Sequence, residues 1–190
     1  MIQSTIDIAA AVTPPPPPVV LRDAALFDLP EILAIERQSF SFPWAPGDFR
    51  RSGPCVVLVV GGEVIGFAVY NCVRQQETGR PPEIEIRNLA ISKPWRGKGA
   101  ATTLVRWMKK QIEHGHYRKL SAVVSERNDA AIAFFRAIGC RATGIVHQPW
   151  AADTQDDGIR FVYCRQTPRL LPMVIDEVMG RPAKESPCGK

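Results

Sequence analysis

The chain has 190 residues, of which 45% are hydrophobic and 23% charged, as expected for one globular domain with a sizeable core. The formal net charge of +5 favours an anionic partner without distinguishing nucleic acid, an acidic protein surface and a phosphorylated cofactor. The five cysteines are scattered and form no C-x-x-C pair, which argues against a zinc site or a disulfide framework and predicts a reducing, cytoplasmic location. No apolar run approaches the ~20 residues of a membrane span, and the N-terminus lacks the basic start of a signal peptide.

Both ends of the chain differ in composition from its centre. Residues 1–18 close with the proline run Pro14 to Pro18, which forces a polyproline II rod and predicts a tail or spacer, or alternatively a docking motif. Residues 168–190 join a short apolar piece to a polar close, and we expect a partly disordered extension there. The domain itself is therefore expected over residues 19–167.

The first half of the domain alternates strand and helix patterns. Asp28 and Pro30 are typical of a helix start, and Gly61-Gly62 of a hairpin turn. In order, we expect a strand over 19–24, a helix from 28 to about 40, a short helix from 46, and strands over 55–60 and 64–73.

The second half adds the remaining strands and two longer helices. We expect strands over 83–91, 120–125, 142–146 and 159–163, and helices over about 98–114 and 128–138. The order β-α-α-β-β-β-α-β-α-β-β predicts an α+β fold, an α/β sandwich. Its mixed, largely antiparallel sheet of seven strands would contain one parallel β-α-β unit and carry helices on both faces.

The stretch "PWRGKGAATTL" places small residues where the helix over 98–114 begins. The first turn of a helix leaves about four backbone N–H groups without a partner, and the macrodipole adds positive potential there. Small side chains let a diphosphate approach those donors, although an ordinary turn is the alternative. The stretch differs from the dinucleotide fingerprint, because Thr102 replaces its third glycine, and from a P-loop, because Gly99 follows Lys98.

Two spaced motifs resemble the Gcn5-related N-acetyltransferase (GNAT) superfamily over about residues 19–165. Arg96-x-x-Gly99-x-Ala101 after "NLAI" is similar to its acetyl-CoA signature, Q/R-x-x-G-x-G/A. The early "IERQSFSFPW" is similar to the ribosomal-protein alanine N-acetyltransferases of the RimI type. The second motif, in "SERNDAAIAFFRAIGC", matches at Asn128, Ala131, Ile132, Phe134, Phe135 and Gly139.

The resemblance implies acetyl-CoA as cosubstrate, no metal, and an amine acceptor. The strand end Leu89, Ala90 and Ile91 would pair with the pantetheine arm. The pyrophosphate would lie on Arg96, Gly97, Lys98, Gly99, Ala100 and Ala101, and the thioester end near Asn128 and Phe135. The acceptor would contact Glu36, Phe42, Trp44 and Trp150.

The resemblance also indicates which residues carry the chemistry. Val123 stands at the RimI-type base position and Phe135 at the acid position, and neither side chain transfers protons. Glu85 matches the glutamate base of the histone-acetylating branch, with a solvated glutamate on a sheet face as the alternative. Ser125 and Tyr163 are weak candidates for the acid.

We therefore predict an acetyl-CoA-dependent N-acetyltransferase whose acceptor is a protein or peptide N-terminal α-amine. The alternatives are a small-molecule amine acetyltransferase and an acyl-CoA-binding regulatory module without catalysis. Nucleic-acid binding is disfavoured, because no aromatic residues interleave with the basic run to form a stacking platform. That run consists of Arg106, Lys109, Lys110, Arg118 and Lys119.

Overall fold

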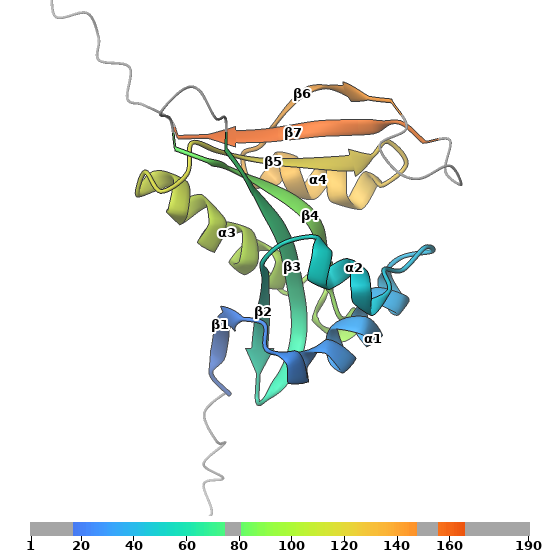
Figure 1. Ribbon diagram of the computed structural model, residues 1–190. Coiled ribbons are helices and arrows are strands. Elements are labelled where there is room, and N and C mark those ends of the chain that lie inside the picture. The colour runs from blue at the N-terminus through green and yellow to red at the C-terminus, as the bar shows by residue number, and fades with distance from the viewer. Residues whose placement is uncertain (1–16, 75–80, 148–155, 166–190) are drawn as a thin grey trace, which may run out of the picture.

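The computed structural model describes residues 17–74, 81–147 and 156–165, which form one sheet flanked by helices (Figure 1). The sheet has seven strands in the order β1-β2-β3-β4-β5-β7-β6, and every neighbouring pair is antiparallel except the parallel pair β4–β5. The predicted α+β fold class is confirmed. The strands are β1 (Val19–Asp23), β2 (Cys55–Val60), β3 (Glu63–Val73), β4 (Glu83–Ile91), β5 (Lys119–Ser125), β6 (Arg141–Val146) and β7 (Gly158–Cys164).

Helices cover both faces of the sheet and enclose two hydrophobic clusters. Helices α3 and α4 pack against one face, and α1 and α2 against the other, mainly over β2 to β4. The helices are α1 (Leu29–Ser39), α2 (Pro46–Arg51), α3 (Ala100–Glu113) and α4 (Asp129–Ala137), with 3-10 turns η1 (Leu26–Asp28) and η2 (Lys93–Trp95). The buried stripe of α3, spaced at helical intervals as predicted, is Ala100, Leu104, Val105, Met108 and Ile112.

Helix α3 begins later than the sequence predicted. We expected its start near Lys98, but the first helical residue is Ala100 and Gly99 is the N-cap. Gly97 and Gly99 take φ values of 72° and 84°, which lie in the left-handed region that favours glycine. The glycines therefore form a turn in front of the helix and do not belong to its first turn.

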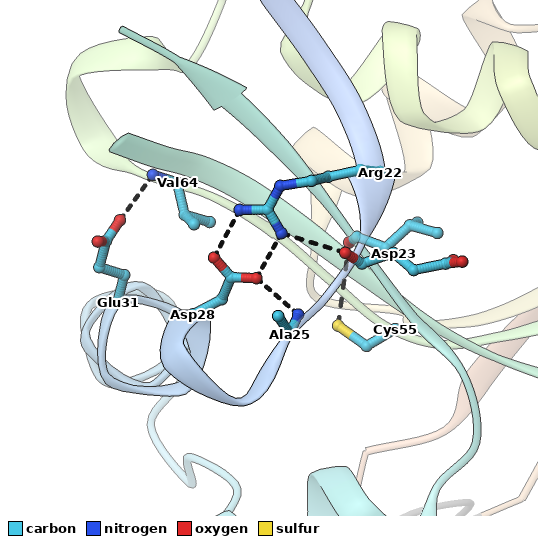
Figure 2. A network of polar contacts seen from close by, with 8 residues as sticks. Arg22, Asp23, Ala25, Asp28, Glu31, Cys55 and Val64 are labelled. Carbon is cyan, nitrogen blue, oxygen red and sulfur yellow. Dashed lines mark hydrogen bonds and ion pairs between the residues drawn. The ribbon is translucent and has the colours of Figure 1, made fainter. Parts of the chain in front are cut away.

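Asp28 is the N-cap residue of α1, at the predicted helix start, and stabilises the junction between β1 and α1 (Figure 2). Its carboxylate accepts two hydrogen bonds from the Arg22 guanidinium, at 2.6 and 2.8 Å. It also accepts the Ala25 N–H at 2.7 Å. One turn later, Glu31 accepts the Val64 N–H at 2.6 Å and so connects α1 to β3. These contacts fix the start of α1 against β1 and β3.

The Arg22–Asp28 pair gives a stability prediction with a defined pH dependence. The hydrogen bonds from Arg22 hold the pKa of Asp28 below its usual range, so the pair stabilises the fold above the unfolded-state pKa of about 3.9 and loses this effect as pH falls. We expect Asp28→Asn to lower the free energy of unfolding at pH 7, and the deficit to shrink below about pH 4. Urea titrations of both proteins across this range measure it; a deficit that stays constant would contradict the assignment.

Candidate active site

The parallel strands β4 and β5 are paired over only part of their length. The last paired residues are Ile86 and Ala122, although β4 continues to Ile91 and β5 to Ser125. Figure 1 shows the two strands diverging beyond this point. On the side that faces β5, the main chain of β4 after Ile86 therefore has no strand partner in the described part of the chain. An extended ligand could occupy this opening as an additional strand.

A β-bulge in β4 lies where the opening begins. In the pairing with β3, Val69 is opposite Asn88 but the next residue, Tyr70, is opposite Ile86, so Arg87 is an extra residue in β4. A bulge bends its strand and increases the local twist. We infer that the bulge at Arg87 turns the end of β4 away from β5.

Beyond the end of β4, a row of main-chain donors, the amide row, spans the turn before α3 and the first three residues of the helix. The first α3 hydrogen bond joins the Thr103 N–H to the Gly99 carbonyl at 3.0 Å. The N–H groups from Gly97 to Thr102 have no acceptor among the described residues. A Cβ placed on Gly97 or Gly99 would meet no atom within 4 Å, so the space in front of these donors is open. Together with the helix dipole, this arrangement suits a phosphate.

The two cations of this loop have different environments. Arg96 donates from Nε to the Ile91 carbonyl at 2.9 Å and from Nη2 to Ser39 Oγ at 2.8 Å, so its guanidinium connects the end of β4 to α1. The Lys98 ammonium lies 5.5 Å from the centre of the Trp95 ring. Lys98 is thus the better placed of the two to attract an anion, and phosphate binding by Arg96 stays a prediction.

Glu36 lies in the core and not in the acceptor groove where the sequence placed it. Its side chain is only 1% exposed. Oε1 accepts the Trp44 N–H at 2.9 Å, and both carboxylate oxygens accept Asn88 Nδ2, at 3.1 and 3.0 Å. Burial raises the pKa of Glu36. Glu36 therefore holds the loop between α1 and α2 against the residue that follows the bulge.

The sequence analysis did not predict a role for Asn88. The one indication in the sequence was an amide side chain beside three apolar residues in "NLAI". Asn88 is 8% exposed, and its Oδ1 atom has no hydrogen-bond partner in the described part of the chain. Of the predicted acceptor contacts, Phe42 is 63% exposed and Trp44 is partly buried, with its ring edge-on to Phe49. Their contact with an acceptor stays a prediction, and Trp150 lies outside the described residues.

Glu85 lies on β4 just before the bulge, with its side chain 24% exposed. Its Oε2 atom is 3.5 Å from Arg87 Nη1, a long contact for an ion pair. Its strand neighbour Glu83 is held more firmly, by Arg118 and by Lys119, the latter at 2.9 Å. Of the two carboxylates, Glu85 is thus the less restrained by ion pairs, and its role as a base stays a prediction.

Two residues of the second motif lie at and within α4. Asn128 caps the helix, because its Oδ1 accepts the Ala131 N–H at 3.0 Å, and its Nδ2 has no acceptor among the described residues. Phe135 is 6% exposed and stacks on Phe161 with ring centres 5.7 Å apart. Asn128 Nδ2 is free to donate to a ligand, whereas Phe135 lies mainly in the core, and ligand contact by either residue stays a prediction.

The weak acid candidates have other partners. Ser125 Oγ donates to Asp156 Oδ2 at 3.3 Å. Tyr163 donates to Glu113 Oε1 at 3.2 Å, and burial raises its pKa. Tyr163 is also opposite Leu120, near the paired end of β5, and so lies at the end of that strand away from the opening. The described residues thus supply no evident general acid.

A metal site, a membrane-spanning helix and a further cavity are the other features that could add a function to the described residues. No three His, Cys, Asp or Glu side chains come together as a possible metal site within residues 17–74, 81–147 and 156–165. No helix in that part of the chain has the length and apolar character needed to cross a membrane. A hollow of about 290 Å³ between α4, β6 and β7 contains none of the predicted site residues. Its lining residues are Glu126, Arg136, Ala142, Gly144, Ile145, Asp157 and Ile159.

A sheet that opens between its two parallel strands, beside a helix start whose N–H groups have no acceptor among the described residues, fits a CoA-dependent acyltransferase. The chain belongs to the acetyltransferase (GNAT) family, whose model matches residues 21–140. It is a GNAT acetyltransferase, and the resemblance stated from its motifs is confirmed. No curated protein matches the chain.

Solved structures with similar folds include enzymes whose names indicate different acceptors. The ribosomal-protein-S18-alanine N-acetyltransferase of Escherichia coli is 21% identical, with a TM-score of 0.66 over 77% of this chain and 93% of that one. NAA60 of Arabidopsis thaliana in complex with acetyl-CoA is 19% identical, with a TM-score of 0.67 over 77% and 99%. A putative phosphinothricin N-acetyltransferase is 22% identical, with a TM-score of 0.62 over 77% and 98%. At these identities the likeness establishes the fold and not the acceptor.

The amide row before α3 predicts a position-specific loss of CoA binding. We expect Gly99→Asp to weaken CoA binding at least tenfold, about 1.4 kcal/mol, because a carboxylate would face the phosphates. Gly115→Asp is the matched control, since Gly115 has a φ of 82° and open space around it but follows the other end of α3. Calorimetry measures both affinities. Equal affinities in the two variants would show that the phosphates bind elsewhere.

The buried carboxylate of Glu36 predicts a pH-dependent stability. Because its folded-state pKa is raised, its stabilising contribution is complete below the unfolded-state pKa of about 4.3 and is lost as pH rises through the folded-state value. We expect the free energy of unfolding of the wild type, minus that of Glu36→Gln, to fall as the pH rises above about 4.3. Denaturant titrations at several pH values test this, with Glu63→Gln at an exposed position of β3 as the control. A difference that grows with pH would contradict it.

Proposed function

We propose that the chain transfers the acetyl group of acetyl-CoA directly to a primary amine, that of a protein or peptide N-terminus. The observation that carries this proposal is the opening between β4 and β5, which ends beside the unpaired donors from Gly97 to Thr102. In this proposal the pantetheine arm pairs with the main chain of Leu89, Ala90 and Ile91 as an added strand. Its pyrophosphate lies on the amide row, with Lys98 beside it.

The transfer requires that the amine lose a proton and that the departing sulfur gain one. The amine nitrogen bonds to the thioester carbon, the C–S bond breaks, and the departing sulfur takes up a proton. At pH 7 an α-amine with a pKa of about 8 is roughly 10% neutral, whereas a lysine amine with a pKa of about 10.4 is below about 0.1% neutral. An N-terminal acceptor therefore needs less help from a base. Glu85, partly exposed and with only a long contact to Arg87, is our proposed base, acting directly or through water.

Two other functions remain as alternatives, each with its own support. The putative phosphinothricin N-acetyltransferase among the similar folds is consistent with a small-molecule acceptor. Val123 and Phe135, at the expected base and acid positions, favour an acyl-CoA-binding module without catalysis. Thiol release from acetyl-CoA, measured with N-terminal peptides, lysine peptides and polyamines, distinguishes the three. Tight CoA binding without turnover on any acceptor would identify the module, and a cytoplasmic location stays a prediction.

The proposed base gives a direct test. We expect Glu85→Gln to lower kcat/KM at least tenfold, and by up to the ~10²–10⁴ typical of general acid–base catalysis, while CoA affinity stays unchanged. Glu83→Gln is the matched control, because Glu83 shares the strand and the sheet face but forms ion pairs with Arg118 and Lys119. Steady-state thiol release together with calorimetry measures both quantities. Unchanged kcat/KM in Glu85→Gln would remove Glu85 from the mechanism.

A further inference from the structure

Two arginines lie next to each other on the sheet beyond β5, and neither has a carboxylate partner among the residues that the structure describes. Arg160 of β7 is directly opposite Val123 of β5, and Arg141 of β6 is opposite Val162, two residues after Arg160. Side chains two residues apart on a strand share a face, so both arginines lie on the face that carries Val123. Neither guanidinium forms an ion pair or a hydrogen bond within the described part of the chain.

That face is also the face of the proposed base. Val123 shares its face with Ser121, which is paired with Glu85 across the β4–β5 ladder. Helix α1 packs against β3 and β4 on this side, and the core formed with α3 and α4 lies on the opposite side. Arg141 is exposed and Arg160 partly exposed. Both guanidiniums are therefore accessible from the side on which the acceptor would enter.

The other cations of this face that the structure describes near Glu83 and Glu85 have a carboxylate partner. Arg87 contacts Glu85, and Arg118 and Lys119 both contact Glu83. Residues in the diagonal relation of Arg160 and Arg141 lie about 7–8 Å apart in a sheet, and like charges at such positions repel. Two unpaired guanidiniums at that spacing can converge on one carboxylate, which relieves the repulsion and accepts charge-assisted hydrogen bonds.

The distance between Arg160 and the opening beside β4 indicates which kind of anion the two arginines could bind. Val123 is the first β5 residue beyond the paired region, and Arg160 is one strand further on. With strands about 4.8 Å apart, Arg160 lies about 10 Å from β4, two strand spacings away. A free amino acid holds its amine and carboxylate within about 4 Å. An extended peptide advances about 3.3 Å per residue, so an acidic side chain near the second or third residue covers the distance.

We propose that Arg160 and Arg141 bind the carboxylate of an acceptor peptide whose second or third residue is acidic, and so set its specificity. This inference rests on the proposed transfer to an N-terminal amine. It assigns the excess positive charge of this face to acceptor recognition.

Matched peptides that differ only by Glu or Gln at position two or three test the proposal. Thiol release from acetyl-CoA gives kcat/KM for each peptide with the full chain. We expect the wild type to prefer the Glu peptide at least tenfold, as for one charge-assisted hydrogen bond, and Arg160→Gln to lose most of this preference. Arg141→Gln should lose part of it, and Arg160→Lys should keep part of it because the charge remains. Arg136→Gln, an exposed arginine of α4, is the control and should keep the full preference.

A second readout separates this proposal from the proposed function. If no peptide is acetylated, the affinities of a fluorescent Glu peptide and of the matched Gln peptide are measured with CoA-saturated protein. Both the wild type and Arg160→Gln are measured. If the wild type binds the Glu peptide more tightly and Arg160→Gln does not, carboxylate binding by the two arginines is supported even though the transfer reaction has failed. Equal kcat/KM and equal binding of the two peptides would overturn it. If free glutamate is acetylated and no peptide is, the proposal that the bound carboxylate belongs to a peptide is wrong.

Discussion

The architecture of this protein depends on one irregularity in its sheet. Main-chain hydrogen bonds would be expected to continue between two adjacent parallel strands, yet β4 and β5 separate after three residue pairs. The extra residue Arg87 lies at that point, and a bulge bends the strand that contains it. The separation leaves main-chain groups of β4 facing an opening, and buried groups of this kind are rarely left unpaired. In the proposed function, a ligand with amides along its length would pair with them as another strand does.

The charged residues discussed above fall into two groups with different physical roles. One group, Arg22, Asp28, Glu36 and Arg96, makes several short hydrogen bonds to the protein and holds α1, its following loop and the end of β4 in place. The other group, Glu85, Arg160 and Arg141, has weak or no charged partners among the described residues, and the proposals assign these charges to a substrate. A buried carboxylate such as Glu36 is tolerated because Asn88 and the Trp44 N–H hydrogen-bond to it.

The loop before α3 presents main-chain donors and few side-chain groups to the space in front of it. Its glycines adopt φ values that other residues rarely take, and they leave the donors of the helix start uncovered. The arginine of the motif, in contrast, binds the protein itself through Ile91 and Ser39. The motif thus combines a ligand-facing main chain with a side chain that fixes the position of the loop.

The sequence by itself determined the order of elements, the fold class and the glycine-rich turn before α3, because periodicity and turn residues are local properties. It misplaced the start of α3 by two residues, since positive φ values at Gly97 and Gly99 are seen only in the folded chain. Only the tertiary structure decided that Glu36 is buried against Asn88, 52 residues away, and that Arg160 lies opposite Val123. Strand register and burial arise from contacts between distant segments, and no local pattern of residue types encodes them.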